Sequence, residues 1–410
     1  MNAGDTAWVL ISTVLVFVMT PGLAFFYGGL VRRKNVLSIL MQCFIIMCVI
    51  SLQWVLYGYS LAFGPDTGWG IIGSLEWAGL KGVGGAPNGD YAATIPHLVF
   101  MIFQAMFAII TPALIIGAFA ERVKFSSFLV LTILWATLVY DPLAHWVWGV
   151  GGWMRKLGAL DFAGGIVVHV SSGISALVMA IMLGKRIGYA KEPFRPHNLP
   201  FTVLGGALLW FGWFGFNAGS ALAANDLAAN AFVTTNTATA AAGLTWALIE
   251  WRLHGAPTIL GAVTGAVAGL VAITPACGFV SPLSSIFIGV GVSMICYIAI
   301  AIVKAKLGYD DSLDAFGVHG VGGAWGTIAT GLFAEKAINS AGADGLLFGG
   351  MHQFLVQLMS LGIAVLYAVV VTMILFKVVD ALLGMKVDKK SEIIGLDLSQ
   401  QSESAYTVID

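Results

Sequence analysis

Residues 161–184, with the sequence DFAGGIVVHVSSGISALVMAIMLG, decide how this chain is interpreted. The stretch is long and apolar enough to cross a bilayer, whose core of about 30 Å requires roughly 20 apolar residues in a helix. It nevertheless opens on Asp161 and carries His169 in its interior. Ionisable groups inside a membrane-spanning helix are costly and tend to line an internal path. The stretch therefore predicts a membrane helix that serves a function.

The composition extends this interpretation to the whole chain. Of 410 residues, 59% are hydrophobic and 10% are charged, with a mean hydropathy of +0.90, whereas a soluble domain carries about 25% charged residues. The apolar runs do not alternate with a period of two, as the strands of a membrane barrel would, so we expect helices. The eleven predicted spans are 7–31, 36–63, 97–120, 125–146, 162–184, 199–223, 228–249, 256–275, 282–303, 315–334 and 352–379.

Several classes of protein are disfavoured by what the sequence lacks. Asp5 rather than Lys or Arg precedes the first run, which predicts a retained span and not a cleaved signal peptide. Cys43, Cys48, Cys277 and Cys296 form no CxxC pair, so neither a disulfide framework nor a zinc site is expected. Walker A loops, cofactor fingerprints and a nucleophile beside a base are also missing. We expect no enzyme activity, no cofactor, no metal and no nucleic-acid partner.

The basic residues predict the orientation of the chain. If the amino terminus lies outside, the inner loops hold sixteen of the 20 Lys and Arg residues and the outer loops hold four. The positive-inside rule then places the amino terminus outside and the carboxyl terminus in the cytoplasm. The expected location is the cytoplasmic (inner) membrane, where the chain passes many times through the lipid.

Eleven spans can be divided into two five-helix units and a final helix. A five-helix unit that is repeated must return in inverted orientation, as in many transporters. The fifth run contains GGIVVHV and the tenth contains FGVHGVGGAWG, so each half ends on a helix with one histidine. We expect residues 1–385 to form a transmembrane domain and residues 386–410 a cytoplasmic tail. Gly261, Gly265 and Gly269 predict close packing between helices.

The ionisable residues within or beside the spans are the first functional candidates. Asp161, His169 and His319 each have a structural alternative. Asp161 precedes its apolar run and fits an N-cap equally well, although a capping carboxylate near a pore would still favour a cation. The two histidines could be core residues satisfied by neighbours. Neutral imidazoles in a narrow apolar duct could instead pass hydrogen bonds to a small polar molecule or relay a proton.

Aromatic residues gather in three places, and the usual explanation is the aromatic belt at the membrane interfaces. The clusters are FMIFQAMF at 100–107, HWVWG at 145–149 and WFGWFGFNAGS at 210–220. Aromatic ring faces can also hold a cation, each contributing about 0.5–2 kcal/mol. Ser220, beside Trp and Phe residues, would add a hydroxyl acceptor. These clusters therefore also fit a cation site at a pore mouth.

The residues at this point resemble one family across the whole chain: the ammonium transporters, the Amt branch of the Amt, Mep and Rh superfamily. The motifs that carry the resemblance are PGLAFFYGGLVRRKNVLS, FQAMFAIITPALIIGAFAER, DPLAHWVWG, ALDFAGGIVVHVSSG, WFGWFGFNAGS, DDSLDAFGVHGVGGAWG and GLDLSQQSESAY. The resemblance implies a homotrimer of eleven-helix protomers in the membrane lipid, each with its own pore between two inverted halves.

The resemblance also implies roles for individual residues. An outer ammonium site would comprise Phe107, Trp148 and Ser220 with the Ala163 carbonyl nearby, and Phe107 would stack on Phe216 as a gate. The remaining roles are Asp161 in orienting the site and in deprotonation, His169 and His319 as paired pore histidines, Phe26, Phe103, Gln104, Trp213 and Asn217 as supporting wall, and Asp314 at the cytoplasmic exit. From the sequence alone, Asp314 also fits a cap of the tenth helix.

The implied function is transport of ammonium, with methylammonium as an analogue. A bare ammonium ion is too costly to bury and neutral ammonia is not, so a separated proton travelling by a polar path would solve the desolvation problem. That the proton also crosses, making transport electrogenic, is what the resemblance implies. One alternative is an ammonium sensor that signals to a cytosolic partner, but the chain has no output domain and keeps both histidines. A passive Rh-like ammonia channel is the other alternative, and Trp148 with Ser220 disfavours it.

The tail keeps part of the family's pattern. It retains GLDLS and a closing AY, while QQSES replaces the more usual His-Gly-Glu stretch. In the family this tail lies beneath the trimer, where a PII-type nitrogen-signalling protein can plug the vestibule. A PII-type partner is therefore an expectation for this chain.

Overall fold

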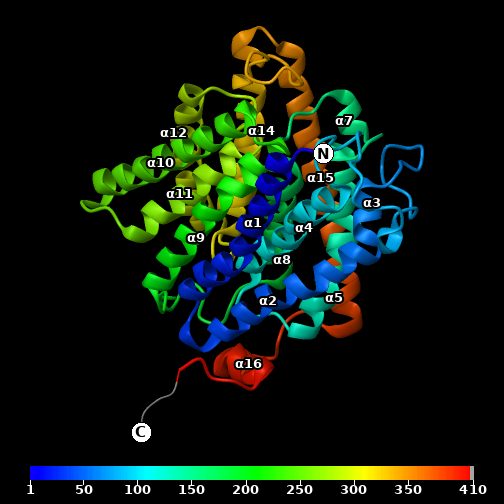
Figure 1. The fold of residues 1–410 in the computed structure, drawn as a ribbon. Coiled ribbons are helices and arrows are strands. Elements are labelled where there is room, and N and C mark those ends of the chain that lie inside the picture. The colour runs from blue at the N-terminus through cyan, green and yellow to red at the C-terminus, as the bar shows by residue number, and fades with distance from the viewer. Residues whose placement is uncertain (407–410) are drawn as a thin grey trace.

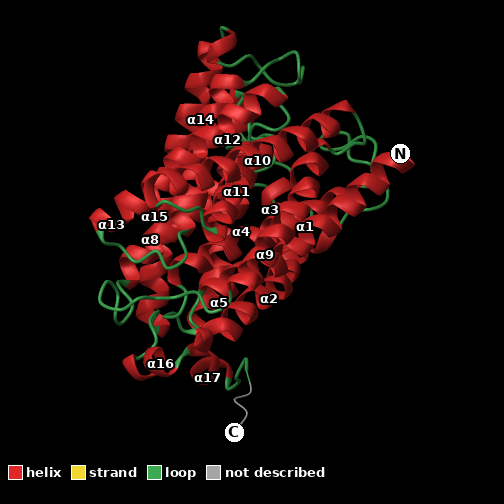
Figure 2. Cartoon of the chain, turned by 90° about the vertical axis from the view of Figure 1, so that its left-hand side faces the viewer, coloured by secondary structure: helices red, strands yellow, loops and turns green. Residues whose placement is uncertain are grey.

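The computed structural model describes residues 1–406, and within them the chain is a bundle of helices without strands (Figures 1 and 2). Eleven helical segments match the predicted spans in order, each with ends within about five residues of the prediction. They are α1 (Ala3–Leu30); α2 (Val36–Gln53), η2 (Trp54–Gly58) and α3 (Tyr59–Phe63); α4 (His97–Phe119); α5 (Phe125–Trp135), η4 (Ala136–Tyr140) and α6 (Asp141–Trp148); η5 (Gly165–Val170) and α8 (Ser171–Leu183); α9 (Leu199–Ala218); α10 (Asp226–His254); α11 (Ile259–Ile273); α12 (Pro282–Tyr297), η7 (Ile298–Val303) and α13 (Lys304–Leu307); η8 (Phe316–Gly320) and α14 (Val321–Phe333); and α15 (Met351–Leu383).

Short helices complete the chain outside these segments. They are η1 (Arg33–Asn35), η3 (Ala78–Leu80), α7 (Trp153–Leu157), η6 (Gly219–Ala221), η9 (Leu346–Phe348), α16 (Lys389–Ile394) and α17 (Leu396–Gln401). The elements η2, η4, η5, η7 and η8 are π-helical turns inside longer helices. Such turns are rare and frequently mark functional sites. Two of them, η5 and η8, contain the histidines predicted to line a pore.

Eight of the segments are long and apolar enough to cross a membrane. The other three are α10, α11 and the combined η8 and α14. In α10, the hydroxyls of Thr235 and Thr239 each donate to the carbonyl four residues earlier at 2.6 Å, which satisfies polar groups that lower the hydropathy of this helix. The predicted class, an all-helical integral membrane protein, is confirmed, and a count of eleven spans fits it.

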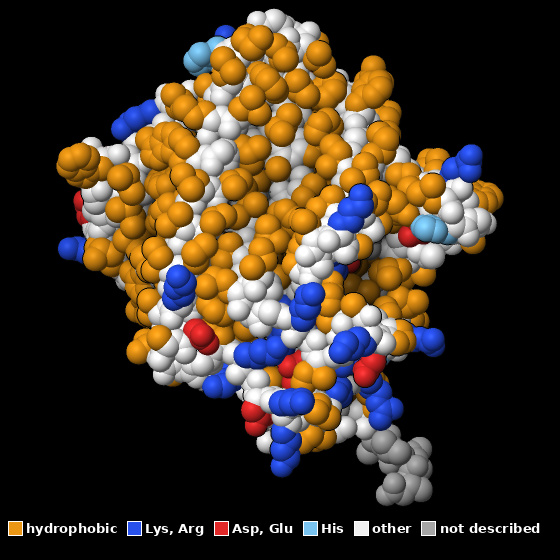
Figure 3. All heavy atoms as spheres, turned by 180° about the vertical axis from the view of Figure 1, so that it is seen from behind, with side chains coloured by type: hydrophobic (Ala, Val, Ile, Leu, Met, Phe, Trp, Pro, Cys, Tyr) orange, Lys and Arg blue, Asp and Glu red, His pale blue; other side chains and the backbone are white. Residues whose placement is uncertain are grey.

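The surface of the bundle is divided as a membrane protein requires. Figure 3 shows apolar side chains over the middle and upper part of one face, while Lys and Arg side chains gather mostly toward the lower end, near the carboxyl-terminal segment. The described ends of the chain lie at opposite ends of the bundle (Figures 1 and 2). We call the end with the 64–96 loop the outer end and the end with α16 the inner end, following the predicted orientation.

Glycines let the helices approach closely where the halves and their neighbours meet. A Cβ atom added to Gly261, Gly265 or Gly269 of α11 would lie only 2.2 to 2.6 Å from side chains of α10. The prediction of tight packing at this stripe is confirmed. At the centre of the bundle, a Cβ on Gly173 of α8 would stand 2.0 Å from the backbone nitrogen of Gly320 in η8. Even a methyl group is too large for this crossing.

Buried ion pairs hold the inner end together. The carboxylate of Glu121 contacts Arg32 at 2.7 Å and Arg186 at 3.1 Å, and Arg186 reaches Asp310 at 2.8 Å. Arg122, fully buried, donates to the Asp310 carbonyl at 2.6 Å. We call these five residues the inner ion network. Burial raises the pKa of both acids, but their arginine partners outweigh it and hold the pKa of Glu121 and of Asp310 below the usual range.

The carboxyl-terminal segment packs against the inner end. The Asp397 carboxylate accepts the backbone N–H of Ser38 at 2.8 Å, so a residue of the tail caps the first turn of α2. Glu392 accepts the N–H of Ile187 at 2.6 Å. The segment therefore joins helix ends that are far apart in sequence. The last four residues of the expected tail, 407–410, lie outside the described residues.

Candidate functional site

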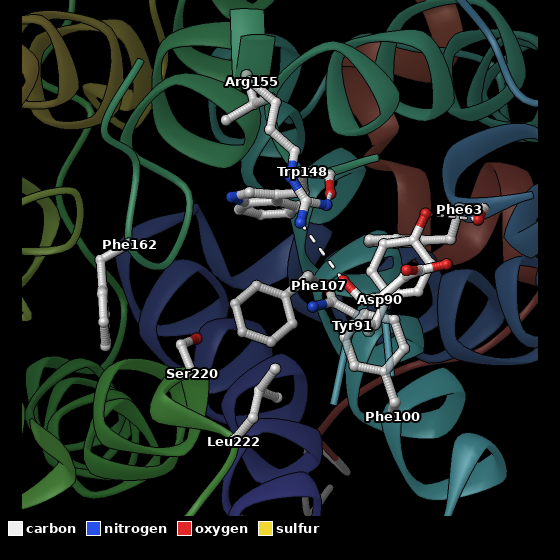
Figure 4. Close-up of a pocket in the computed structure, with 12 residues that line it drawn as sticks. Phe63, Asp90, Tyr91, Phe100, Phe107, Trp148, Arg155, Phe162, Ser220 and Leu222 are labelled. Atoms are coloured by element: carbon white, nitrogen blue, oxygen red, sulfur yellow. Dashed lines mark hydrogen bonds between the residues drawn. The ribbon is translucent and has the colours of Figure 1, made fainter. Parts of the chain in front are cut away.

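A cavity of about 200 Å³ opens at the outer end of the bundle (Figure 4). We call it the outer vestibule. It is lined by Phe63, Asp90, Tyr91, Phe100, Gln104, Phe107, Val147, Trp148, Arg155, Phe162, Ser220 and Leu222. Three of these, Phe107, Trp148 and Ser220, are the residues expected to form an outer cation site, so the fold brings the three predicted clusters to one place.

The three side chains present complementary chemistry to a small cation. The rings of Phe107 and Trp148 lie edge to face, with centroids 6.0 Å apart and an angle of 82°. Ser220 in η6 donates its hydroxyl hydrogen to the Phe216 carbonyl at 2.8 Å, which leaves lone pairs on its oxygen free to accept. Aromatic faces attract cations, and a hydroxyl oxygen accepts their N–H groups. The site therefore suits a cation that donates hydrogen bonds.

Asp161 lies behind the vestibule rather than in its wall. Its carboxylate accepts four backbone N–H groups, those of residues 164–167, at 2.5 to 3.1 Å. The N-cap interpretation of this residue is thus confirmed. Its backbone carbonyl also accepts the Trp148 indole N–H at 2.8 Å, so Asp161 fixes both the helix with His169 and the orientation of Trp148. Ala163 is buried beside Phe162, a residue of the vestibule wall.

A line of stacked rings leads from the vestibule into the bundle. Phe107 lines the vestibule, Phe216 lines the cavity beside the histidines, and their ring centroids lie 4.3 Å apart. Phe216 is 6.1 Å from His169, and His169 stacks on His319 at 5.4 Å with only 17° between the ring planes. The two histidines come from η5 and η8, which are separated by about 150 residues in sequence. The structure thus places them in contact.

The histidines line a narrow apolar cavity. Both are buried, and neither ring nitrogen of His169 nor Nδ1 of His319 has a hydrogen-bond partner within the described chain. The interpretation as core histidines satisfied by neighbours is therefore wrong for His169. The cavity beside them measures about 10 Å³, and its other lining side chains are apolar or aromatic. This is close to the minimum of about 10–15 Å³ that one water molecule needs.

The supporting residues differ in how directly they meet this path. Trp213 stacks on His169 at 5.3 Å and donates its indole N–H to Thr274. Phe103 packs against Phe107 at 5.0 Å, and Gln104 lines the vestibule. Asn217 is buried and donates to Thr235 at 2.9 Å. Phe26 contacts the α9 backbone at Gly205 and lines neither cavity.

Comparison with known proteins gives the family of the chain. The family model described as the Ammonium Transporter Family matches residues 7–406. The chain belongs to the ammonium transporter family. It is 55% identical to the ammonium transporter of Bacillus subtilis (strain 168) over 407 residues, which cover 99% of each chain. The transporter is therefore a multi-pass membrane protein and not an enzyme.

Solved structures support the same assignment for the transporter. The crystal structure of Candida albicans Mep2 matches with a TM-score of 0.90 and 38% identity, covering 99% of this chain and 90% of that one. A structure described as a sensor Amt protein matches with a TM-score of 0.88 and 29% identity, covering 97% of this chain and 98% of that chain. The fold is therefore shared with transporters and with a sensor.

The second five-helix unit of the transporter repeats the capping arrangement of the first unit, with Asp311 in place of Asp161. Asp311 accepts the N–H groups of Ala315 and Phe316 at 3.1 and 2.8 Å, as Asp161 does for its own helix. Asp314 instead accepts Lys304 at 2.6 Å and has a positive φ of 60°. The alternative that Asp314 caps the tenth helix is therefore wrong, because Asp311 is the cap.

Asp311 and several residues of the vestibule wall escaped the sequence analysis. Asp311 stands eight residues before His319, the same interval that separates Asp161 from His169, and this repeat could have revealed it. Arg155 and Asp90 line the vestibule although they come from outer loops without a motif, so no sequence signal pointed to them. Among residues 1–406 no cluster of His, Cys, Asp or Glu could hold a metal ion.

Proposed function

We propose that this protein transports ammonium across the cytoplasmic membrane through the path formed by the vestibule, the phenylalanine pair and the two histidines. The observation that carries the proposal is the continuous ring series Phe107, Phe216, His169 and His319, in which successive centroids lie 4.3, 6.1 and 5.4 Å apart. The series connects a site suited to a cation with a duct suited to a small neutral molecule.

Recruitment takes place in the vestibule. An ammonium ion that sheds water there gains the ring faces of Phe107 and Trp148 and the hydroxyl oxygen of Ser220. Cation–π contacts contribute about 0.5–2 kcal/mol each, which offsets part of the lost hydration. The Ala163 carbonyl, next to the vestibule wall, is a further acceptor for the ion.

Deprotonation follows because the duct beyond Phe216 is apolar and has room for one water molecule at most. A bare cation is expensive to bury, whereas neutral ammonia is not. Asp161 takes part by fixing Trp148 and so orienting the ion, while its negative charge attracts the cation to the site. The ion transfers its proton to the free acceptor nitrogen of His169, and the proton then passes to His319 separately from ammonia. Both cross the membrane, which makes transport electrogenic. Potassium ions, which cannot give up a proton, are rejected at the histidines.

We extend the proposal to the rest of the molecule on the basis of its resemblance to the family. Residues 1–385 form the transport domain and 386–410 a regulatory tail, with the amino terminus outside and the carboxyl terminus in the cytoplasm. The protein assembles as a homotrimer in the inner membrane. Asp314 serves as the acidic exit residue at the inner mouth. The contacts of Glu392 and Asp397 with helix ends hold the tail against the inner end, where a PII-type protein would bind.

The test is electrical. Purified protein in liposomes on a solid support should give a saturable current with ammonium and with methylammonium. His169→Ala/His319→Ala should admit potassium currents, while His352→Ala, an exposed histidine on α15, should behave as wild type. An internal pH rise without current would replace electrogenic transport by passive passage of ammonia. Silence in both measurements would refute transport and favour a sensor, for which a structural relative exists.

A further inference from the structure

Arg155 stands at the rim of the outer vestibule and contacts the backbone of Trp148. Its Nη1 donates to the Trp148 carbonyl at 2.7 Å, and its Nη2 donates to the Asp90 carbonyl at 3.4 Å. Figure 4 shows the guanidinium beside the Trp148 indole, with a dashed line to Asp90. One side chain of α7 therefore bridges the end of α6 and the 64–96 loop.

Tyr91 continues this bridge into the outer loop. The Arg155 guanidinium lies over the Tyr91 ring, 5.8 Å from its centroid. The Tyr91 hydroxyl donates to the Phe63 carbonyl at 2.6 Å and accepts the N–H of Val150 at 2.9 Å. Three chain segments, the 64–96 loop, the turn after α6 and α7, thus converge on the backbone next to Trp148.

The contacts hold Trp148 from two sides. Its indole N–H donates to the Asp161 carbonyl, and its own carbonyl accepts from Arg155. Trp148 is the last residue of α6, so this carbonyl lacks a partner in the helix. Capping the end of α6 would require only one donor to the Trp148 carbonyl. Arg155 also donates to the Asp90 carbonyl and lies over the Tyr91 ring, so it attaches the 64–96 loop to the end of α6 as well.

We propose that Arg155 is a positioning residue that sets the affinity of the outer site by tying Trp148 to the 64–96 loop. This inference rests on the proposed function, because it concerns the same cation site. The planar fork of arginine can reach two carbonyls at once, which a lysine ammonium does less well. Loss of the bridge leaves the Trp148 ring less fixed over the cation, so binding weakens while the gate and the histidines stay in place.

The experiment measures saturable ammonium currents in liposomes for wild type and three variants. Arg155→Gln should raise KM about five- to tenfold with Vmax unchanged, the scale of one hydrogen bond to a charged group at a partly exposed site. Arg155→Lys keeps the charge but loses the fork, and should raise KM about threefold. Lys156→Gln removes an exposed charge from the same helix outside the vestibule and should leave KM unchanged.

Three results would overturn the inference. They are an unchanged KM in Arg155→Gln, an equal increase in Lys156→Gln, which would assign the effect to charge, and a fall in Vmax alone, which would assign Arg155 a purely structural role. Thermal unfolding of the purified variants checks that each is folded. If the wild type carries no current, the proposed function fails. The inference on Arg155 can then still be tested by measuring how much ammonium raises the Tm of the wild type and of the same variants.

Discussion

Replacing Ser220 by Ala tests the outer site most directly. The change removes one hydroxyl acceptor and leaves the ring faces of Phe107 and Trp148, which are 6.0 Å apart, in place. A hydrogen bond to a charged group contributes about 1.5–3 kcal/mol, and the lower end applies because the vestibule is open to water. This corresponds to a KM for ammonium about tenfold higher. Vmax should not change, because the Phe216 ring and the histidines are not altered.

The assay is the ammonium-evoked current in proteoliposomes as a function of concentration. Ser220→Thr keeps a hydroxyl and serves as the matched control, with a KM near that of wild type. Adding Trp148→Leu to Ser220→Ala removes a ring face and should raise KM further, with the protein still folded. An unchanged KM in Ser220→Ala, or a lower Vmax at constant KM, would refute the assignment of this hydroxyl to the cation.

Other parts of the molecule give further tests. Glu121→Gln removes the acid that Arg32 and Arg186 share, so that Arg32 loses its ion pair and Arg186 keeps only Asp310. The unfolding free energy should fall by about 3 kcal/mol, the lower end of the range for a broken buried ion pair, seen as a lower Tm in detergent; an unaltered Tm would contradict this. Because the pKa of Glu121 and of Asp310 is lowered on folding, their stabilisation is complete above about pH 5 and is lost as the pH falls through the lowered pKa. Tm should therefore fall on acidification, and less so in Glu121→Gln. Asp161→Ala removes the hydrogen-bond acceptor of four backbone N–H groups and should abolish the current. Asp161→Asn keeps one carbonyl acceptor and should preserve more folded protein. A normal current in Asp161→Ala would contradict the role of this residue. Gly173→Ala should force the helices apart at Gly320 and reduce both Tm and current, and wild-type values for both would show that the crossing tolerates a methyl group.

The order and approximate ends of the helices could be predicted because the bilayer imposes them. Each crossing needs a run of apolar residues of similar length, and this requirement is local in the sequence. The vestibule residues were found through motifs, and the fold brings Phe107, Trp148 and Ser220 together. Neither hydropathy nor spacing predicted the stacking of His169 on His319, which depends on how the two halves pack.

Features that depend on contacts between distant segments were missed. Glu121, with a positive φ of 74°, meets arginines that are 89 and 65 residues away. Asp397 caps a helix that begins some 360 residues earlier, and nothing near it in the sequence indicates this partner. Arg155 looks like an ordinary basic residue of an outer loop until the 64–96 loop is folded against it. Polar contacts of this kind follow from tertiary packing and carry no local pattern.

The crossing of Gly173 and Gly320 has a mechanical consequence for the pore. These backbones touch where the two halves meet, and the stacked rings of His169 and His319 lie four residues and one residue away along the chain. A rocking motion of the two halves would have to separate the backbones of Gly173 and Gly320 and break the stacking of the two histidine rings. We therefore expect the width of the proposed pore beside the histidines to stay constant during transport, so that a hydrated ion could not widen it to pass.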